Sequence, residues 1–571
     1  MQAIRNSLFL CTIFLAFVVT ASAQTPNAQF AQLVDQYFAA YYQHRPSEGT
    51  TAGFHQYDAK LEDYSRQGVA AQVNTLKKYL AKFTQLDPKK LTDSEAADRE
   101  MVISYIQSQL LSLAEIRWWE RDPGIYCNGV NNSVFILVMR NYAPLTERLK
   151  AVIAREKQMP HVLAAARANL KNPPRIYTEI ALENLPPIIS FFQTDLPLAV
   201  KDAADAKLQA EFQASNQAVI AALKQYQQFL QEELLPKSNG DFRIGAEFYR
   251  KKLLYDEMVD IPLDRLLQVG YENLRANQAW FKRTAAIIDP NQTAAQILTA
   301  SQKEHPPADK LLDSIRGVLG DVQRFITEHK IITLPSPVLP IVAETPAFMR
   351  ATTTASMDTP GPYEKAKEAY YFATLPDPSW SKEKAEDYLG GFTYGTVLST
   401  SIHEAYPGHY TQFLWVQSAP SKIRKLIGCG TNAEGWAHYT EQMMLDEGYT
   451  NDPKMRLGQL QDALLRNARY IVGIEMHTGK MTYEQAIEFF VKEGYQSREI
   501  ASMESKRGTS DPTYLMYTLG KLAIMKMRED YKALRGNNFT LQEFHDGFMK
   551  QGFAPIKLVR RALLGKDGSL L

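Results

Sequence analysis

The chain has 571 residues, of which 45% are hydrophobic and 22% are charged, so it can bury a large core and is neither disordered nor collagen-like. Its 64 Lys and Arg residues nearly balance its 63 Asp and Glu residues, which leaves a formal net charge of +1. Because nucleic acid and acidic membranes usually select a basic excess, this balance argues against both as partners, and a local site must hold the substrate.

The first residues have the pattern of a secretory signal peptide. Arg5 precedes an apolar run, residues 8–19, that is too short for a stable membrane span, and Ala21-Ser22-Ala23 supplies the small residues that a signal peptidase needs. We therefore predict that residues 1–23 are removed and that the mature protein is secreted, in the periplasm or outside the cell; an uncleaved anchor is the alternative. Cys11 lies inside the apolar run without small residues before it, which argues against a lipoprotein.

Most of the mature chain has the apolar period of helices. Apolar residues recur at threes and fours rather than alternating, and no later segment approaches 18 unbroken apolar residues, so we expect no membrane span in the mature chain. The clearest stripe consists of Leu208, Phe212, Val219, Leu223, Tyr226 and Leu230, in a helix that Pro236 should end. Similar patterns predict helices within 66–114, 146–170, 256–287, 308–329, 454–477, 483–493 and 513–534.

Strand-like composition is scarce. The candidates are Ile331–Val342, whose prolines would confine it to a sheet edge, and Ala369–Leu375, which is rich in Tyr and Phe. No Gly/Ser linker, charge block or internal repeat divides residues 24–571, so we expect a single, mainly α domain, built as one large body or as two lobes, with a small edge sheet. Its cysteines, Cys127 and Cys429, leave a disulfide open.

The stretch SIHEAYPGHY, residues 401–410, is the most informative part of the sequence. His403 and Glu404, at the end of an apolar, small-residue helix, match the start of the H-E-x-x-H pattern, in which two histidines bind zinc and the Glu is a general base. The next histidine, His409, is six residues away instead of four. At about 3.6 residues per turn the two imidazoles would lie roughly 120° apart around a regular helix, which could not chelate an ion.

Pro407 and Gly408 predict a break that solves this problem. Pro407 cannot donate a hydrogen bond to the carbonyl of His403, and Gly408 accepts backbone angles that are closed to other residues. A bulge here would absorb two extra residues and bring His409 beside His403. The alternative is that Pro-Gly ends the helix and His409 caps its last carbonyls.

A second polar face follows in TNAEGWAHYTE, residues 431–441. Glu434, His438 and Glu441 fall at i, i+4 and i+7 and share one face of a helix. An exposed Glu434–His438 pair is the simplest interpretation, but Trp436 and the apolar residues around it indicate burial, and a buried carboxylate needs a cation.

Together the two segments provide a complete catalytic metal site. A catalytic zinc takes three protein ligands and keeps one position for water, so His403, His409 and Glu434 form a full set and leave Glu404 as the base. Two imidazoles with one carboxylate suit zinc, although the sequence does not exclude another divalent ion.

Four segments carry a resemblance to a known family. HEAYPGHY, NAEGWAHYTEQ, DPTYLMYTLGKLAIMKMRED and the earlier RPSEGTTAGFHQYDAKLEDYS resemble the bacterial family catalogued as domain of unknown function 885, over nearly the whole mature chain. That family is zincin-like and similar in helical architecture to gluzincin peptidases with deep clefts. The resemblance implies a mostly α-helical metallohydrolase, a peptidase, with the ligands and base named above. Because the histidine spacing departs from ordinary gluzincins, His438 is the alternative to His409 as second histidine ligand.

The resemblance also indicates further catalytic residues. Tyr517 lies in YLMYTLG at a family position, and its hydroxyl could donate a hydrogen bond to an oxyanion without carrying charge; Tyr514, one helical turn earlier, is the second candidate. His438 could instead orient Glu404 or a zinc ligand through its ring nitrogens.

Three further features are weaker candidates for binding a substrate or a metal. Tyr370–Phe372 could pair with an extended peptide, although an ordinary buried hairpin is the simpler expectation. Lys521 and Arg528, seven residues apart, could bind a terminal carboxylate, or they could be solvated charges. Cys429 as a fourth ligand would close the site and make the metal structural.

The sequence thus predicts a zinc-dependent hydrolase, foremost a metallopeptidase that cleaves small peptides in the periplasm. The alternatives are a zinc amidase that acts on non-peptide amides and a non-catalytic binding protein whose metal is absent or structural. Substrate length, endo- or exopeptidase action and oligomeric state do not follow from the sequence.

Overall fold

The computed structural model describes residues 26–346, 349–350 and 353–571. The predicted signal peptide, residues 1–23 with Cys11, lies outside this part of the chain. No helix among the described residues is long and apolar enough to cross a membrane.

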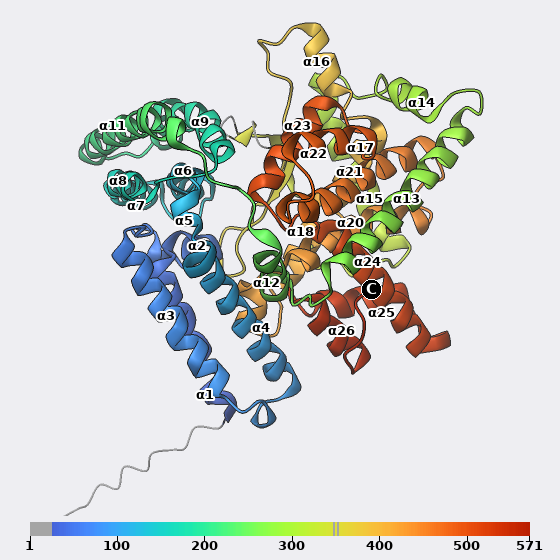
Figure 1. The fold of residues 1–571 in the computed structure, drawn as a ribbon, viewed down its shortest axis with the longest axis horizontal. Helices are drawn as coiled ribbons and strands as arrows, with labels where there is room; N and C mark the ends of the chain where they lie inside the picture. Colours follow the sequence, from blue (N-terminus) through green and yellow to red (C-terminus); the bar gives the residue numbers. More distant parts are fainter. Residues whose placement is uncertain (1–25, 347–348, 351–352) are drawn as a thin grey trace, which may run out of the picture.

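The first half of the chain forms two groups of helices (Figure 1). The first group is α1 (Pro26–His44), α2 (Pro46–Ala52), α3 (Arg66–Gln85) and α4 (Asp93–Leu110). After the short α5 (Trp118–Arg121), the second group packs around its own apolar core and consists of α6 (Gly124–Met139), α7 (Leu145–Glu156), α8 (Met159–Asn169), α9 (Arg175–Ser190), α10 (Leu196–Val200) and α11 (Ala206–Gln228). The predicted stripe from Leu208 to Leu230 is buried in that core, as expected.

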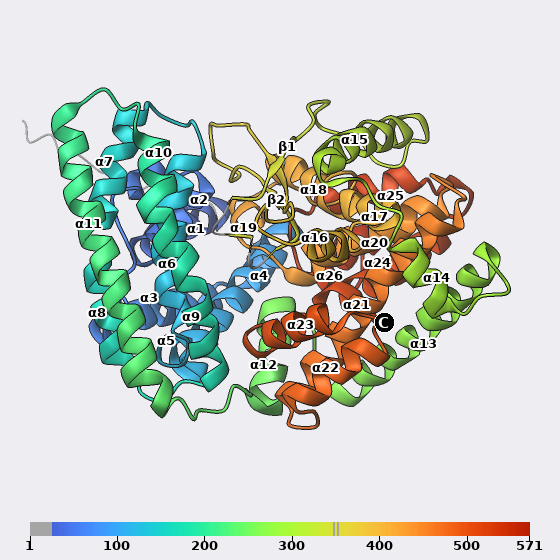
Figure 2. The same ribbon diagram turned by 90° about the horizontal axis from the view of Figure 1, so that it is seen from above.

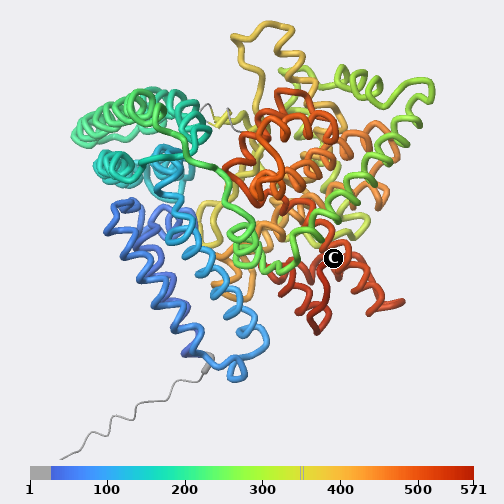
Figure 3. The backbone as a smooth tube through the Cα atoms, viewed as in Figure 1, coloured from blue at the N-terminus to red at the C-terminus, as the bar shows by residue number. Residues whose placement is uncertain are grey.

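The second half of the chain lies on the other side of the molecule, and Figure 3 shows the chain crossing over after α11. Its helices are α12 (Gly245–Glu257), α13 (Leu263–Ile288), α14 (Ala294–Ser301), α15 (Leu311–Glu328), α16 (Lys382–Leu389), α17 (Tyr394–Glu404), α18 (His409–Val416), α19 (Lys422–Leu426), α20 (Gly430–Asp446), α21 (Pro453–His477), α22 (Tyr483–Lys492), α23 (Arg498–Ser510), α24 (Met516–Arg535), α25 (Leu541–Met549) and α26 (Ile556–Leu564). The prediction of a mainly α fold is confirmed.

Several predicted helices are divided where proline interrupts the pattern. The segment 66–114 contains α3 and α4, separated around Pro88, and 146–170 contains α7 and α8, with Pro160 in the first turn of α8. The segment 256–287 begins with the end of α12, and α13 starts only after Pro262. Each division lies beside a proline, which cannot continue the hydrogen bonds of a helix, and none of residues 84–96 between the buried faces of α3 and α4 is buried.

A small three-stranded sheet lies between the α6–α11 group and the second-half helices (Figure 2). Its strands are β1 (Ile341–Glu344), β2 (Ala355–Asp358) and β3 (Tyr370–Ala373), in the order β1-β3-β2. β1 is parallel to β3, with Ile341 opposite Tyr370, and β2 is antiparallel to it, with Asp358 opposite Tyr370. β1 is an edge strand, as predicted for this segment.

The strand predictions need two corrections. Most of Ile331–Val342 is not a strand, because Pro335, Pro337 and Pro340 cannot donate to a sheet, and β1 begins only at Ile341. β3 is the central strand and both of its edges are paired, so the alternative in which Tyr370–Phe372 pairs with a peptide is excluded, and the antiparallel β2–β3 pair agrees with the simpler expectation of a buried hairpin. β3 instead supports the helix beside it, since Tyr371 Oη lies 3.4 Å from Ser401 Oγ in α17.

The largest core joins the first helices to the second half of the chain. Buried residues of α1, α3 and α4 belong to one apolar cluster with residues of α15, α17, α20 and α24. The α6–α11 group keeps a separate core. The prediction of one domain, as one body or two lobes, is not tested by this division.

Glycines set the shortest distances between the helices of the second half. A Cβ on Gly435 of α20 would overlap the backbone of Gly520 in α24, and a Cβ on Gly395 of α17 would overlap α21 at Lys454 and Gly458. Larger residues at these positions would push the helices apart. The close packing fixes how α17, α20, α21 and α24 present their side chains to one another.

We predict that Gly435→Ala lowers the free energy of unfolding by about 1–3 kcal/mol, because the added methyl group meets backbone rather than a movable side chain. Gly317→Ala is the matched control, since Gly317 lies inside α15 with no atom near its missing Cβ, and alanine there should be neutral or should stabilise by up to about 1 kcal/mol. Thermal or denaturant unfolding of both variants measures the difference. Equal stability of the two variants would contradict the close-packing argument.

Candidate metal centre

The break predicted at Pro407-Gly408 is present. α17 ends at Glu404 and α18 begins at His409. The indole Nε1 of Trp436 donates to the Pro407 carbonyl at 2.8 Å and thereby ties the break to α20. Gly408 has φ −74°, which is not left-handed; glycine is needed because a Cβ there would collide with the carbonyl oxygen of His403.

The break brings the two histidines together. The ring centroids of His403 and His409 are 4.8 Å apart, and the rings are nearly perpendicular. Both Nε2 atoms face Glu434 Oε2, at 3.4 Å from His403 and 3.3 Å from His409. One ligand atom from each of the three residues lies within 4.8 Å of the other two, so a single cation can contact all three.

The burial and charge of this cluster fit a cation. The side chains of His403, His409 and Glu434 are 7%, 13% and 25% exposed, so the cluster is shielded but can be reached from solvent. Burial acts to raise the pKa of Glu434, but the two imidazoles hold it well below its ordinary value, so the carboxylate is ionised. Its Oε2 atom nevertheless has no hydrogen-bond partner among the described residues. A buried, ionised oxygen whose nearest polar neighbours are two ring nitrogens at 3.3–3.4 Å is a position that a metal would fit.

A second carboxylate lies behind His403. Glu441 is fully buried, and its Oε1 lies 2.7 Å from His403 Nδ1. Burial acts to raise the pKa of Glu441, but Arg466, at 3.0 Å, and the histidines hold it far below its ordinary value. The ionised carboxylate therefore accepts a hydrogen from Nδ1 and leaves Nε2 of His403 free to face Glu434.

His438 is not part of the cluster. Its Nδ1 lies 3.0 Å from the other oxygen of Glu441, and its buried Nε2 has no hydrogen-bond partner among the described residues. Burial, first, and the charge of Lys521 lower the pKa of His438 to about 3, so the ring is neutral. Of the two candidates for second histidine, the structure places His409, and not His438, beside His403 and Glu434. His438 contacts Glu441, so it reaches His403 only through that carboxylate.

α20 is held at its N-terminus by a buried acid that the sequence patterns did not reveal. Glu257, at the end of α12, accepts hydrogen bonds from the backbone N–H groups of Gly430 at 3.2 Å and Thr431 at 2.7 Å. A carboxylate at this end of a helix satisfies free N–H groups and complements the helix dipole. It fixes the start of the helix that carries Glu434 and Glu441.

The structure shows the surroundings of both cysteines, Cys429 and Cys127. The Sγ of Cys429 lies 2.9 Å from Glu257 Oε2 and does not face the cluster, so Cys429 is not a fourth ligand. Cys127 lies in the separate core of the α6–α11 group, and both cysteines are free and buried. Cys127 and Cys429 therefore form no disulfide in the described structure.

The proposed base and the first oxyanion donor both lie near the cluster. Glu404 is half-buried and directly follows His403. Its carboxylate makes no hydrogen bond or ion pair with the described residues. The ring of Tyr517 stacks beside His403 at 6.3 Å between centroids. Arg507 Nη2 donates to Tyr517 Oη at 3.1 Å, so the hydroxyl hydrogen of Tyr517 is not used in that bond.

The remaining candidates lie elsewhere. Tyr514 is fully buried in another apolar cluster, against Gly473 and Gly508, and does not reach the site. Lys521 is fully buried, which lowers its pKa to about 8, and Arg528 donates to Tyr439 Oη at 3.2 Å. Neither is placed to receive a substrate carboxylate.

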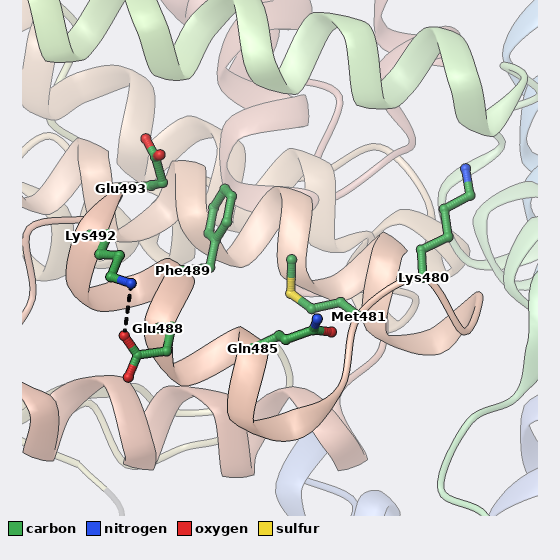
Figure 4. A pocket seen from close by; sticks show the side chains of 7 residues that line it. All are labelled: Lys480, Met481, Gln485, Glu488, Phe489, Lys492 and Glu493. Atoms are coloured by element: carbon green, nitrogen blue, oxygen red, sulfur yellow. Dashed lines mark ion pairs between the residues drawn. The ribbon is translucent and has the colours of Figure 1, made fainter.

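A surface pocket of about 300 Å³ lies along α22 (Figure 4). Figure 4 shows Lys492 and Glu488 paired on one helical face, at 3.3 Å. None of the residues that line this pocket belongs to the cluster or contacts it. We interpret this pocket as an ordinary surface depression between solvated charged side chains.

Comparison with known proteins places the whole chain beside proteins without an assigned role. The family described as "Bacterial protein of unknown function (DUF885)" matches residues 46–563. A solved structure described as "a putative lipoprotein of unknown function from Shewanella oneidensis" is 30% identical, with a TM-score of 0.79, and covers 94% of this chain and 99% of its own. A structure described as "the putative lipoprotein from Colwellia psychrerythraea" is 19% identical, with a TM-score of 0.81, and covers 95% of this chain and 99% of its own, which supports the fold alone. No curated protein matches the chain.

We predict that Glu441→Gln weakens the binding of a divalent cation about 10- to 100-fold, because the neutral amide no longer fixes the ring nitrogen of His403. Glu447→Gln is the control, since Glu447 lies just beyond α20 and pairs only distantly with Arg528. Titration with zinc and a competing chelator measures both affinities, and circular dichroism checks the fold. An unchanged affinity in a folded Glu441→Gln protein would remove Glu441 from the metal centre.

Proposed function

The chain belongs to the DUF885 family, and we propose that it is a zinc-dependent hydrolase, a metallopeptidase that cleaves small peptides. Its ligands would be His403, His409 and Glu434, and its general base Glu404. The observation that carries the proposal is the meeting of two Nε2 atoms at one carboxylate oxygen, within reach of a single cation.

The number and type of groups fit a catalytic rather than a structural ion. Three protein ligands leave one coordination position open, and the partial exposure of Glu434 and His409 gives solvent and substrate access to it. Zinc bound there would lower the pKa of a water to roughly 7 and polarise a carbonyl. Cys429, the residue that would have closed the site, points instead to Glu257.

The chain itself supplies the base. Glu404 follows a ligand directly and has no competing partner among the described residues, so its carboxylate is free to take a proton from an attacking water. The Tyr371 hydroxyl lies 3.4 Å from Ser401 Oγ, three residues before Glu404 on α17, and burial, first, and the charge of Glu404 raise the pKa of Tyr371. Glu404 can then pass the proton to the leaving amine.

Tyr517 would stabilise the developing oxyanion. Its hydroxyl accepts from Arg507 and keeps its own hydrogen for another acceptor. Arg466, Arg469 and Arg507 lie 5.0–5.9 Å from the ring centroid. Burial raises the pKa of Tyr517, so it remains a neutral donor during turnover.

The export proposal rests on the leader sequence. The predicted cleavage after Ala23 would release the mature chain outside the cytoplasmic membrane, in the periplasm. The two similar structures bear names of lipoproteins, which are also exported proteins, although here Cys11 lacks the small residues expected before a lipidated cysteine.

We predict that Glu404→Gln lowers peptide hydrolysis by about 10²- to 10⁴-fold while zinc binding stays stoichiometric, because the substitution removes the base and no ligand. His409→Ala should lose zinc and activity together. Digestion of a mixed peptide library, followed by mass spectrometry, and metal analysis of the same preparations measure both effects.

The same experiment separates the alternatives. Full activity of Glu404→Gln would end the proposed mechanism. Zinc binding with cleavage of non-peptide amides but no peptides would indicate the amidase. Failure to bind zinc in zinc-containing buffer would indicate the non-catalytic binding protein.

We predict that the protein recovered from the periplasm begins at Gln24. Intact-mass measurement after expression with the native leader tests this, and Cys11→Ser should leave both the mass and the location of the mature protein unchanged. A lipid-bearing N-terminus at residue 11, or an intact Met1, would contradict it.

A further inference from the structure

A cavity of about 440 Å³ lies where the first helices meet the second half of the chain, and one of its lining residues, Phe413, lies beside the candidate ligand His409. We propose that it binds the C-terminal residue of the substrate, which carries a bulky apolar side chain and a free carboxylate, so that the enzyme removes residues from the C-terminus. This inference rests on the proposed hydrolase function and names its substrate class.

The cavity and the candidate metal cluster share one short helix. Phe413 lies four residues after His409 on α18, with its ring centroid 6.5 Å from that of the imidazole. Phe413 lines the cavity and packs on Phe553, another lining residue, at 5.3 Å. On the other side, the cavity is lined by Met357 of β2, and β2 packs against α17, the helix that carries His403. A substrate bound in the cavity would therefore present its adjoining peptide bond to the cluster.

The walls are aromatic and rigid. Phe38, Tyr41 and Tyr42 of α1 line the cavity together with Tyr105 of α4. The hydroxyls of Tyr41 and Tyr105 lie 2.7 Å apart, and Tyr41 also donates to Glu48 at 2.6 Å, so the polar ends of these rings are held in place. Fixed aromatic faces suit an aromatic or large aliphatic side chain, and the volume falls within the usual range for small-ligand sites.

The charges of the cavity favour an anion. Lys425 of α19 lines it and forms no ion pair with the described residues; its Nζ lies 5.6 Å from the centroid of the Tyr363 ring. The acids that line it are already neutralised, since Glu48 pairs with Arg45 at 2.6 Å and Asp358 pairs with Arg140.

The arginines near Tyr517 do not offer a similar free charge. Arg466 pairs with Glu441, Arg469 binds both oxygens of Glu504, and Arg507 pairs with Asp511. Lys425 thus offers a substrate carboxylate a positive charge that is not held in an ion pair within the described structure, whereas Lys521 is buried and does not line the cavity.

A residue that has both an apolar side chain and a free carboxylate is the C-terminal residue of a peptide. Hydrolysis of the last peptide bond would add one water across it: the carbonyl carbon gains the hydroxyl and becomes a new carboxylate, and the leaving amine takes the proton. The products are a free apolar amino acid and a peptide shortened by one residue. An internal segment of a longer chain would lack the carboxylate for Lys425.

The test uses the full-length, zinc-loaded Glu404→Gln protein, so that binding is measured without turnover. The probes are two peptides of the same sequence that end in Phe, one as the free acid and one as the C-terminal amide. We expect the acid to bind about 10- to 100-fold more tightly, the range for one hydrogen bond to a charged group, and we expect Lys425→Met to abolish this difference. Lys422→Met is the matched control, because Lys422 lies on the same helix, pairs with Asp35 and does not line the cavity.

The outcomes are distinct. Equal binding of acid and amide to the protein with Lys425 intact overturns the proposal and needs no further variant, as does an acid preference that survives in Lys425→Met. With the active protein, release of C-terminal Phe or Leu ahead of Ala or Asp supports it, and cleavage at internal bonds without such a preference overturns it. An acid preference that depends on Lys425, in a protein that hydrolyses no peptide when Glu404 is present, upholds the cavity and refutes the hydrolase function.

Discussion

The candidate metal centre depends on one constraint: the two nitrogens of the His403 imidazole each face a carboxylate from the same helix. Glu434 and Glu441 are two turns apart on α20, and His403 of α17 lies between them, with Nδ1 toward Glu441 and Nε2 toward Glu434. A shift of α20 by one residue would rotate both carboxylates away by about 100°. The site therefore requires a single register between α17 and α20.

The surrounding structure holds that register from three directions. Glu257 binds the free N–H groups at the start of α20, Gly435 allows the helix to touch the backbone of α24, and Trp436 bonds the carbonyl of Pro407 in the break that precedes α18. Arg466 adds a buried positive charge beside Glu441. Removing one partner of such a buried set leaves a charge or a polar group without compensation, which costs more than the contact itself contributes. The same interactions that stabilise the core thus preserve the geometry of the cluster.

The sequence allowed prediction of what depends on neighbours along the chain. Helical periodicity predicted most of the helices, and Pro407-Gly408 predicted the break. The i, i+7 spacing predicted that Glu434 and Glu441 lie on one helical face. Partners from distant segments gave no such signal: Glu257 caps a helix 173 residues later, and Arg466 is an ordinary charge within a helical pattern. The helix ends around Pro88 were missed because the prediction used the apolar period of a long segment and not the mostly polar, unburied residues 84–96. The roles of the assembled residues in catalysis remain proposals.

Different segments of the chain form the candidate metal centre and the neighbouring cavity. All residues of the candidate metal centre come from 403–441, with Arg466 and Tyr517 close by, whereas α1, α2 and α4 supply much of the neighbouring cavity. α1 and α4 also share the largest apolar core with α17 and α20, so the cavity wall is fixed relative to the cluster rather than attached as a loose lobe. Under the proposed function, substitutions on the cavity face of α1 would alter the shape offered to a substrate without touching His403, His409 or Glu434. Because α17 and the first helices pack in one core, such changes would act on substrate selection before they act on the chemistry.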